Sequence, residues 1–297
     1  MKDKLSITVI IAAKNESENI GRCLKALGKA ERVVVVDSGS SDGMVGIVEA
    51  TGAELVQFEY SGGYPKKRQW ALENLEIRTD WTLLLDADEF VPEGLWREIE
   101  AVVEGNGPCD GYYITKGYHF LGRKFRYGGF SFQAMLLFRT GAGKFENLID
   151  APETGLDMEV HERVIIDGNT SRLKTPLVHE DFKGLHAYID RHNRYATWES
   201  QLRWFEKHHG QYGQGESIGA KLSGDAQSRR RYLKRIAMAV PCEPLLWFAY
   251  HYLLRGAFLE GKEGFIASAI RSGYIALVHA KMYELEKAED PQGRGRE

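Results

Sequence analysis

The sequence predicts an α/β protein with a doubly wound, mostly parallel sheet in its N-terminal part and a helical C-terminal extension. Two observations support this class. Over the first hundred residues, short apolar runs alternate with segments of helical periodicity, as in parallel sheets covered by helices on both faces. After Leu185 the pattern is helical as far as about Glu289.

The first strand is expected over 7–13, because a β-branched run of this kind is typical of a strand buried on both faces. Asn15 or Ser17 can cap the helix that follows. The other elements of this part are expected to be strands over 32–37, 53–58 and 81–85 and a helix over 44–51. From 111 to about 172, segments rich in Tyr, Phe and Gly predict further short strands.

Composition and charge exclude several classes of protein. The 297 residues carry a net charge of −3, so no overall basic field attracts nucleic acid. The three cysteines lie far apart and form no CxxC pair, which argues against a structural zinc site or a disulfide framework. No run reaches the roughly 18 apolar residues of a membrane-spanning helix, and the N-terminus lacks the apolar run of a signal peptide. We therefore expect a cytoplasmic protein that binds no nucleic acid.

Two carboxylates, Asp86 and Asp88, directly follow the strand expected over 81–85. Ligands of parallel sheets bind at the carboxyl ends of the strands. Carboxylates one residue apart can hold a divalent cation that bridges a diphosphate. An acidic helix N-cap is the structural alternative, but the position after a buried strand favours a cation site.

Polar residues also follow the two neighbouring strands. Asp37 ends the strand expected over 32–37, and Lys14, Asn15 and Glu16 follow the first strand at the same edge of the sheet. These groups can hydrogen-bond a base and a ribose in one crevice, although a turn-forming role for Asp37 is the alternative. The GxGxxG and GxxxxGK[ST] motifs of other nucleotide-binding proteins are missing.

A Gly-rich segment over 62–69 carries three consecutive cations, Lys66, Lys67 and Arg68, at the expected start of a helix. Such a segment suits an anionic diphosphate. A solvated basic helix start is an equally open interpretation.

Eight short segments spread over nearly the whole chain carry a family pattern. They are AAKNE at 12–16, VDSGSSDG at 36–43, KRQWAL at 67–72, LDADE at 85–89, VHE at 160–162, PLVH at 176–179, NRY at 193–195 and RGAF at 255–258. Together they resemble glycosyltransferase family 2, and within it the branch of the bacterial lipopolysaccharide core β-1,4-glucosyltransferases. Gln69 departs from the asparagine of this branch, which concerns the detail of the donor loop and not the class.

The resemblance implies a GT-A fold, a nucleoside-diphosphate sugar donor, expected to be a UDP-sugar, and inversion at the anomeric carbon. It also implies roles for individual residues. The donor-binding residues are expected to be Ala12, Glu16, Asp37, Lys67, Arg68, Asp86 and Ala87. The ligands of a divalent cation, Mg²⁺ or Mn²⁺, are expected to be Asp86, Asp88 and His179.

An inverting transfer needs one general base to accept the proton of the attacking hydroxyl. The resemblance favours Glu162 for this role. His161, Glu180 and Asp181 lie nearby in the sequence and are the alternatives.

These roles divide the chain into three expected regions. Residues 1–110 are expected to bind the nucleotide sugar, 111–184 to face the acceptor, and 185–297 to form a helical region. Within the last region, a basic cluster over 229–235 precedes an apolar, aromatic segment over 245–254. This combination fits adsorption to the anionic cytoplasmic face of the inner membrane, and a core helix is the open alternative.

The expected function is sugar transfer to a cell-envelope glycolipid or saccharide acceptor, such as lipopolysaccharide core. A sugar-nucleotide nucleotidyltransferase shares carboxylates at strand ends. That class usually has a Gly-rich loop with a basic residue after the first strand, where this chain has Lys14-Asn-Glu16. A non-catalytic homologue that binds sugar or lipid is the third interpretation, and the presence of Asp86, Asp88 and Glu162 argues against it.

Overall fold

The structure, a computed structural model, describes residues 4–105, 107–160, 162–180, 183–223, 226–238, 240 and 242–289. Backbone contacts divide the chain into two compact units. The first unit comprises the chain up to Phe125 together with Ser131–Phe145 and Asp157–Gly184. The second comprises Arg126–Phe130, Glu146–Leu156 and the chain from Leu185 onward.

A ten-stranded sheet forms the body of the first unit, with the strand order β3-β2-β1-β4-β8-β6-β12-β5. The strands on this path are β1 (Leu5–Ala13), β2 (Ala30–Asp37), β3 (Glu54–Gln57), β4 (Trp81–Asp86), β5 (Glu89–Phe90), β6 (Gly111–Phe120), β8 (Phe132–Arg139) and β12 (Leu177–His179). Strands β1 to β4 run parallel, and β8 is antiparallel to both β4 and β6. The predicted doubly wound, mostly parallel sheet is confirmed.

Four short strands complete this unit. They are β7 (Arg123–Lys124) and β11 (Thr170–Arg172), which pair with β6, and β9 (Gly143–Phe145) and β10 (Val164–Ile166), which pair with each other. The helices of this unit are α1 (Ile20–Lys25), α2 (Met44–Thr51), α3 (Lys67–Asn74) and α4 (Glu93–Glu104). Helix α1 begins later than predicted, and its N-cap Asn19 makes no capping hydrogen bond with its side chain. The expected caps Asn15 and Ser17 instead lie in the loop before it.

The core of the first unit explains why β1 and β4 are central. Ile7, Val9 and Ile11 of β1 and Leu83 of β4 have almost no exposed surface, because both strands have sheet neighbours on both sides and these side chains belong to the main hydrophobic core. Each such side chain contributes about 1.5–3 kcal/mol of burial free energy. The β-branched runs in the sequence therefore mark the strands buried on both faces.

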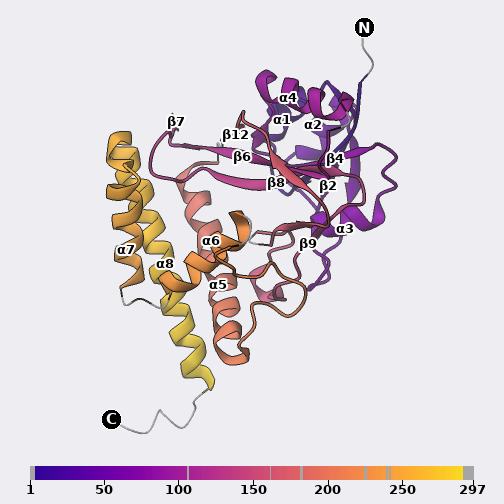
Figure 1. The fold of residues 1–297 in the computed structure, drawn as a ribbon. Coiled ribbons are helices and arrows are strands. Elements are labelled where there is room, and N and C mark those ends of the chain that lie inside the picture. The colour runs from indigo at the N-terminus through magenta and orange to yellow at the C-terminus, as the bar shows by residue number, and fades with distance from the viewer. Residues whose placement is uncertain are drawn as a thin grey trace, which may run out of the picture. The chain divides into compact units, whose positions relative to one another are not determined.

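The second unit is mainly helical and appears in orange to yellow in Figure 1. Its elements are η1 (Pro152–Thr154), α5 (Gly184–His209), α6 (Ala226–Met238), α7 (Glu243–Ala249), the π-helical turn η2 (Tyr250–Leu254), η3 (Ala257–Glu260) and α8 (Gly261–Glu289). Ala196, Tyr274, Ile275 and Val278 form a small core between α5 and α8. Among the residues that the structure describes, no helix has the length and apolar composition needed to cross a bilayer.

Candidate functional site

The order of the strands places the candidate site at the carboxyl end of β1. The chain runs from β1 outward through β2 and β3 and then returns to the opposite side of β1 with β4. Such a switch point is where ligands bind in parallel sheets. Here Ala12 is in register with Asp86 of β4, and Ala13 is in register with Asp37 of β2. Ala12, Asp37 and Asp86, which were predicted to bind the donor, therefore lie at the same edge of the sheet.

Asp37 is fully buried at this edge. Its carboxylate accepts hydrogen bonds from the backbone N–H and hydroxyl of Ser40, the latter with an Oγ–Oδ1 distance of 2.5 Å. Gln57 Nε2 donates to the other oxygen at 3.2 Å. These bonds hold the turn that follows β2, so the structure shows Asp37 as a residue that shapes this turn.

Three consecutive cations each contact a different acidic residue of the segment over 157–162. Lys66 pairs with Glu162, Lys67 Nζ lies 3.3 Å from Asp157 Oδ2, and Arg68 Nη1 donates to the backbone oxygen of Glu159 at 2.7 Å. These contacts hold the 157–162 segment against the start of α3. The structure places the three cations at the start of α3, near the end of β1, and the sequence did not identify Asp157 as the partner of Lys67.

Lys67 has no exposed surface, and its Nζ also donates to the backbone oxygen of Ala13 at 2.7 Å. Burial lowers the pKa of Lys67, and Asp157 opposes this shift. Lys67 therefore joins the end of β1 to the 157–162 segment.

Glu159 is buried and accepts hydrogen bonds from the backbone N–H groups of Arg68 and Gln69, at 3.1 and 2.9 Å. Burial raises the pKa of Glu159, whereas Arg68 and the hydrogen bond from Gln69 lower it. Its carboxylate thus satisfies the first N–H groups of α3. The side chain of Gln69 accepts a hydrogen bond from the backbone N–H of Phe145 at 2.7 Å, so this departure from the family pattern has a structural role.

Asp86 lies between two cations. Its Oδ1 contacts Arg68, and its Oδ2 lies 2.7 Å from Lys116 Nζ. Lys116 also contacts Glu89 Oε1 at 2.6 Å, while Glu89 Oε2 accepts a hydrogen bond from the backbone N–H of Asp86. Sequence reasoning did not identify Lys116, which comes from β6. Ala87 is buried between the two aspartates.

Asp88 and His179, two of the predicted cation ligands, contact each other. His179 Nε2 lies 3.1 Å from Asp88 Oδ2, because β12 pairs with β5 and brings His179 opposite Glu89. Burial lowers the pKa of His179, whereas the carboxylates of Asp88 and Glu89 raise it, and the net direction is upward. The predicted pair is therefore assembled from positions 91 residues apart in the sequence.

Glu16 lies after β1 and contacts Lys183, and it accepts a hydrogen bond from Asn19 Nδ2 at 2.8 Å. Burial raises the pKa of Glu16, and the hydrogen bond from Lys183 opposes the shift. Among the alternative bases, Glu180 pairs with Arg22 at 2.9 Å. His161 and Asp181 lie outside the described residues.

The donor set at Asp88 and His179 fits a divalent cation in part. Two adjacent ligands of an octahedral Mg²⁺, with bonds of about 2.1 Å, lie about 3 Å apart, and the observed separation is 3.1 Å. Mg²⁺ usually takes only one or two protein carboxylates and completes its shell with substrate phosphates and water. Within the described part of the chain, no group of three or more His, Cys, Asp or Glu residues could hold a metal ion. Asp86 faces Arg68 and Lys116 instead.

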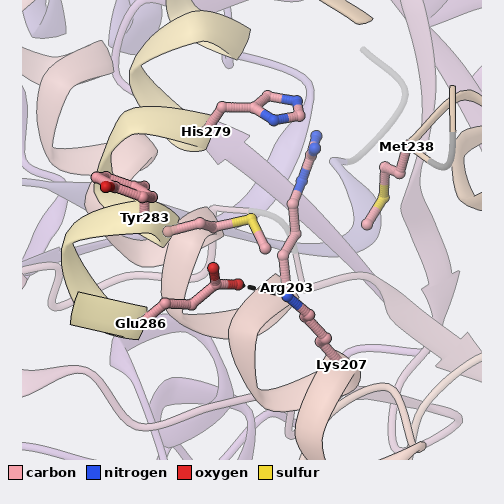
Figure 2. Close-up of a pocket in the computed structure, with 7 residues that line it drawn as sticks. Arg203, Lys207, Met238, His279, Tyr283 and Glu286 are labelled. Carbon is pink, nitrogen blue, oxygen red and sulfur yellow. Dashed lines mark hydrogen bonds and ion pairs between the residues drawn. The ribbon is translucent and has the colours of Figure 1, made fainter. Parts of the chain in front are cut away.

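A separate cavity of about 320 Å³ lies within the second unit, between α5, α6 and α8 (Figure 2). Its cationic side chains are already paired. Arg203 contacts Glu199 and Glu243, Lys207 Nζ lies 2.5 Å from Glu286 Oε1, and His279 contacts Glu243. The carboxylates between these helices thus neutralise the cations that a diphosphate would need, so the cavity does not resemble a diphosphate site.

The mostly parallel sheet, with the antiparallel β8 between β4 and β6, has the architecture of the GT-A fold. Residues 8–146 match the family model of Glycosyl transferase family 2, so the chain contains a domain of this family and is a glycosyltransferase. The chain is 24% identical, over 96% of its length and 94% of the relative's, to the lipopolysaccharide core biosynthesis glycosyltransferase LpsC of Rhizobium meliloti.

Two further comparisons support the family and the fold. A glycosyltransferase of Rickettsia conorii is 37% identical over 97 residues, which is 32% of this chain and 33% of that protein. The mannosyltransferase PcManGT of Pyrobaculum calidifontis, solved with GDP-Man and Mn²⁺, superposes with a TM-score of 0.50. The alignment covers 94% of this chain and 87% of that one at 16% identity, and it shows a shared fold.

Proposed function

We propose that this protein is an inverting glycosyltransferase that moves a sugar from a UDP-sugar to a glycolipid or saccharide acceptor of the cell envelope, such as lipopolysaccharide core. The similarity to LpsC over nearly the whole length of both chains supports the acceptor class. One observation carries the proposal. The cations at 66–68 bind the acidic segment over 157–162 at the edge of the sheet where Asp86 and Asp88 lie.

In the proposed reaction, residues 1–110 bind the nucleotide sugar and 111–184 face the acceptor. Ala12, Glu16 and Asp37 line the crevice beside the nucleotide, and Lys67, Arg68 and Ala87 lie at its diphosphate end. Asp88 and His179 would hold a divalent cation, which would supply neutralising charge to the leaving diphosphate. Residues 185–297 form a helical region, and we propose a cytoplasmic location because nucleotide sugars are the donor.

Glu162 is proposed to accept the proton of the acceptor hydroxyl. The hydroxyl oxygen forms the new bond to the anomeric carbon from the face opposite the diphosphate, and the bond to the diphosphate oxygen breaks, so the configuration inverts. Lys66 pairs with Glu162 and holds its carboxylate in place, because both side chains are almost completely buried. The pair must open for the acceptor to reach the carboxylate.

A binding panel tests the donor. The full chain is mixed with UDP-, GDP-, CMP- and dTDP-sugars, with and without Mn²⁺ or Mg²⁺, and its thermal stability is measured. We expect one UDP-sugar with cation to raise the melting temperature most, because a ligand that binds only the native state stabilises it. A response to nucleoside triphosphate plus sugar phosphate, with none to nucleotide sugars, would instead support a nucleotidyltransferase.

A further inference from the structure

The outward face of α7 and η2 in the second unit is apolar, while its inward face is polar. Glu243 and His251 are buried, and Trp247, four residues from each, packs against the small core between α5 and α8. Glu243 pairs with Arg203, Trp247 Nε1 donates to Glu243 Oε1 at 3.0 Å, and His251 Nδ1 donates to the backbone oxygen of Gly128 at 2.6 Å. A helix of a water-soluble protein normally shows the opposite pattern. The medium outside this helix is therefore expected to be apolar.

Several large apolar side chains of this segment are exposed. Leu245 is 68% exposed, and Leu246 and Leu253, two helical turns apart, are each about half exposed. Phe248 contacts Phe265 of α8 with ring centres 5.7 Å apart, and Tyr252 contacts both Phe265 and Phe258. We call Leu245, Leu246, Leu253, Phe258 and Phe265 the apolar face. Apolar patches that extend over several elements mark interaction sites.

An open cavity of about 380 Å³ lies in this face, lined by Tyr252, Phe258, Phe265 and the methylene-rich side chain of Lys262. Aromatic side chains with one polar tip prefer the boundary between lipid headgroups and acyl chains. The cavity and its rings are therefore suited to acyl chains with a cation at the rim.

Exposed cations outnumber exposed carboxylates at the apolar face, where Glu263 is partly exposed beside Lys262. Between Glu243 and Lys262, the two acidic residues are buried, and Glu260 accepts hydrogen bonds from the backbone N–H groups of Arg126 and Tyr127. Both Arg255 and Lys262 are exposed. Anionic lipid headgroups complement this arrangement.

The basic cluster over 229–235, predicted to be the electrostatic anchor, makes ion pairs with carboxylates. Arg231 Nη1 lies 2.6 Å from Glu146, Lys234 lies 2.7 Å from Glu199, and Arg235 lies 2.8 Å from Glu206. These three cations are used in ion pairs within the second unit. Of the cations in this cluster, these three are therefore partly neutralised by carboxylates, and the predicted basic anchor stays a prediction.

We propose that α7, η2 and the start of α8 form a membrane-docking surface that lies on an anionic phospholipid bilayer, with the apolar face in the headgroup boundary and Arg255 and Lys262 on the lipid phosphates. The proposal does not depend on the donor or acceptor proposed above. It describes a chain that lies on the bilayer, in agreement with the finding that no described helix can span one.

Flotation of the full chain with vesicles tests this surface. We expect it to float with vesicles of phosphatidylcholine and phosphatidylglycerol, less so at high salt, and much less with phosphatidylcholine alone. The double variant Leu246→Glu/Leu253→Glu should lower partitioning about tenfold or more, because carboxylates then enter the boundary. The matched control Ile189→Glu/Leu222→Glu changes two exposed apolar residues elsewhere in the same unit and should float like the parent chain.

The two exposed cations provide further variants that keep the apolar side chains, should the glutamate variant fail to fold. Arg255→Gln and Lys262→Gln should each lower partitioning on anionic vesicles about fivefold. Lys221→Gln/Arg229→Gln, which removes two exposed cations elsewhere, should have little effect. The proposal is overturned if the parent chain does not float at low salt or if the face variants float equally well. A lipid-free dimer that Leu246→Glu/Leu253→Glu converts to monomers would also overturn it.

Discussion

Glu162 and Lys66 form a buried ion pair. The next residue, Lys67, binds the end of β1 at Ala13, so the pair lies near this end of the strand. If Glu162 is the base, removing its ability to accept a proton should stop transfer without removing the donor site. We expect Glu162→Gln to lower turnover about a hundredfold or more, because general base catalysis contributes that much. Donor binding, measured by calorimetry with the UDP-sugar, should remain.

The rival carboxylates provide the control for this prediction. Glu180 is paired with Arg22, and Glu180→Gln should keep most of the turnover. Asp181→Asn tests the other rival. If either variant loses turnover while Glu162→Gln retains it, the assignment of the base is wrong.

Lys116 makes a second residue-scale prediction. It contacts both Asp86 and Glu89, and the side chain of Glu89 is completely buried. Lys116→Met leaves a buried carboxylate without its cation, which should lower the free energy of unfolding by about 3 kcal/mol. Urea unfolding of the full chain checks this value. Lys124→Met, which changes an exposed lysine of β7, is the matched control and should be nearly neutral.

The sequence predicted the residues at strand ends but not their partners. Asp86 and Asp37 could be predicted because each directly follows a buried run, and the edge of a parallel sheet collects such residues. Lys116 and Asp157 were missed because their partners lie 30 and 90 residues away in the sequence. No local pattern signals contacts of that kind.

Among the helical elements, the contact of α5 with α7 depends on a buried ionic cluster. Arg203 of α5 pairs with Glu199 and with Glu243 of α7, and all three side chains are almost completely buried. Arg203→Met removes the shared cation and should destabilise the chain by about 3 kcal/mol. Arg194→Met breaks a half-exposed pair with Asp190 and should cost less than about 0.5 kcal/mol. Equal effects in urea unfolding would contradict the structural role of this cluster.

His192 of α5 gives the second unit a pH dependence. Burial lowers its pKa to about 4, and its ring stacks on Tyr188. As the pH falls below about 6.5, the unfolded chain binds a proton that the native chain does not bind until about 4. The free energy of unfolding should therefore decrease over this window.

The variant His192→Phe keeps a ring and removes the proton site, so its stability should fall less between pH 6.5 and 4. Melting temperatures of both chains across this range measure the difference. Parallel curves would show that His192 does not contribute.

The helical elements also show what charge and hydrophobicity patterns cannot predict. The run of cations over 229–235 looked like a solvated anchor, but its partners Glu146, Glu199 and Glu206 come from other segments of the chain. Conversely, the apolar run over 245–254 was compatible with a core helix, and the structure exposes Leu245 and Leu254 instead. Composition gives the charge of a segment, whereas tertiary contacts decide which charges remain at the surface.

For the whole molecule, the sequence predicted the parallel sheet and its family because both depend on local runs and short motifs at strand ends. The match to Glycosyl transferase family 2 covers β1 to β9, where those motifs concentrate. The antiparallel β8 between β4 and β6, and the return of β12 beside β5, follow from pairing between distant segments. The sequence contains no local signal for either.

The central claim is that the chain transfers a sugar from a nucleotide donor to an envelope acceptor with help from Asp88 and His179. The most direct test incubates the full chain with a UDP-sugar, Mn²⁺ and core lipooligosaccharide, and measures the acceptor by mass spectrometry. The account predicts an acceptor heavier by one sugar residue. This product should disappear in Asp88→Asn and in excess chelator, and return when Mn²⁺ is restored. Absence of transfer from every nucleotide sugar tested, or full transfer by Asp88→Asn in excess chelator, would contradict it.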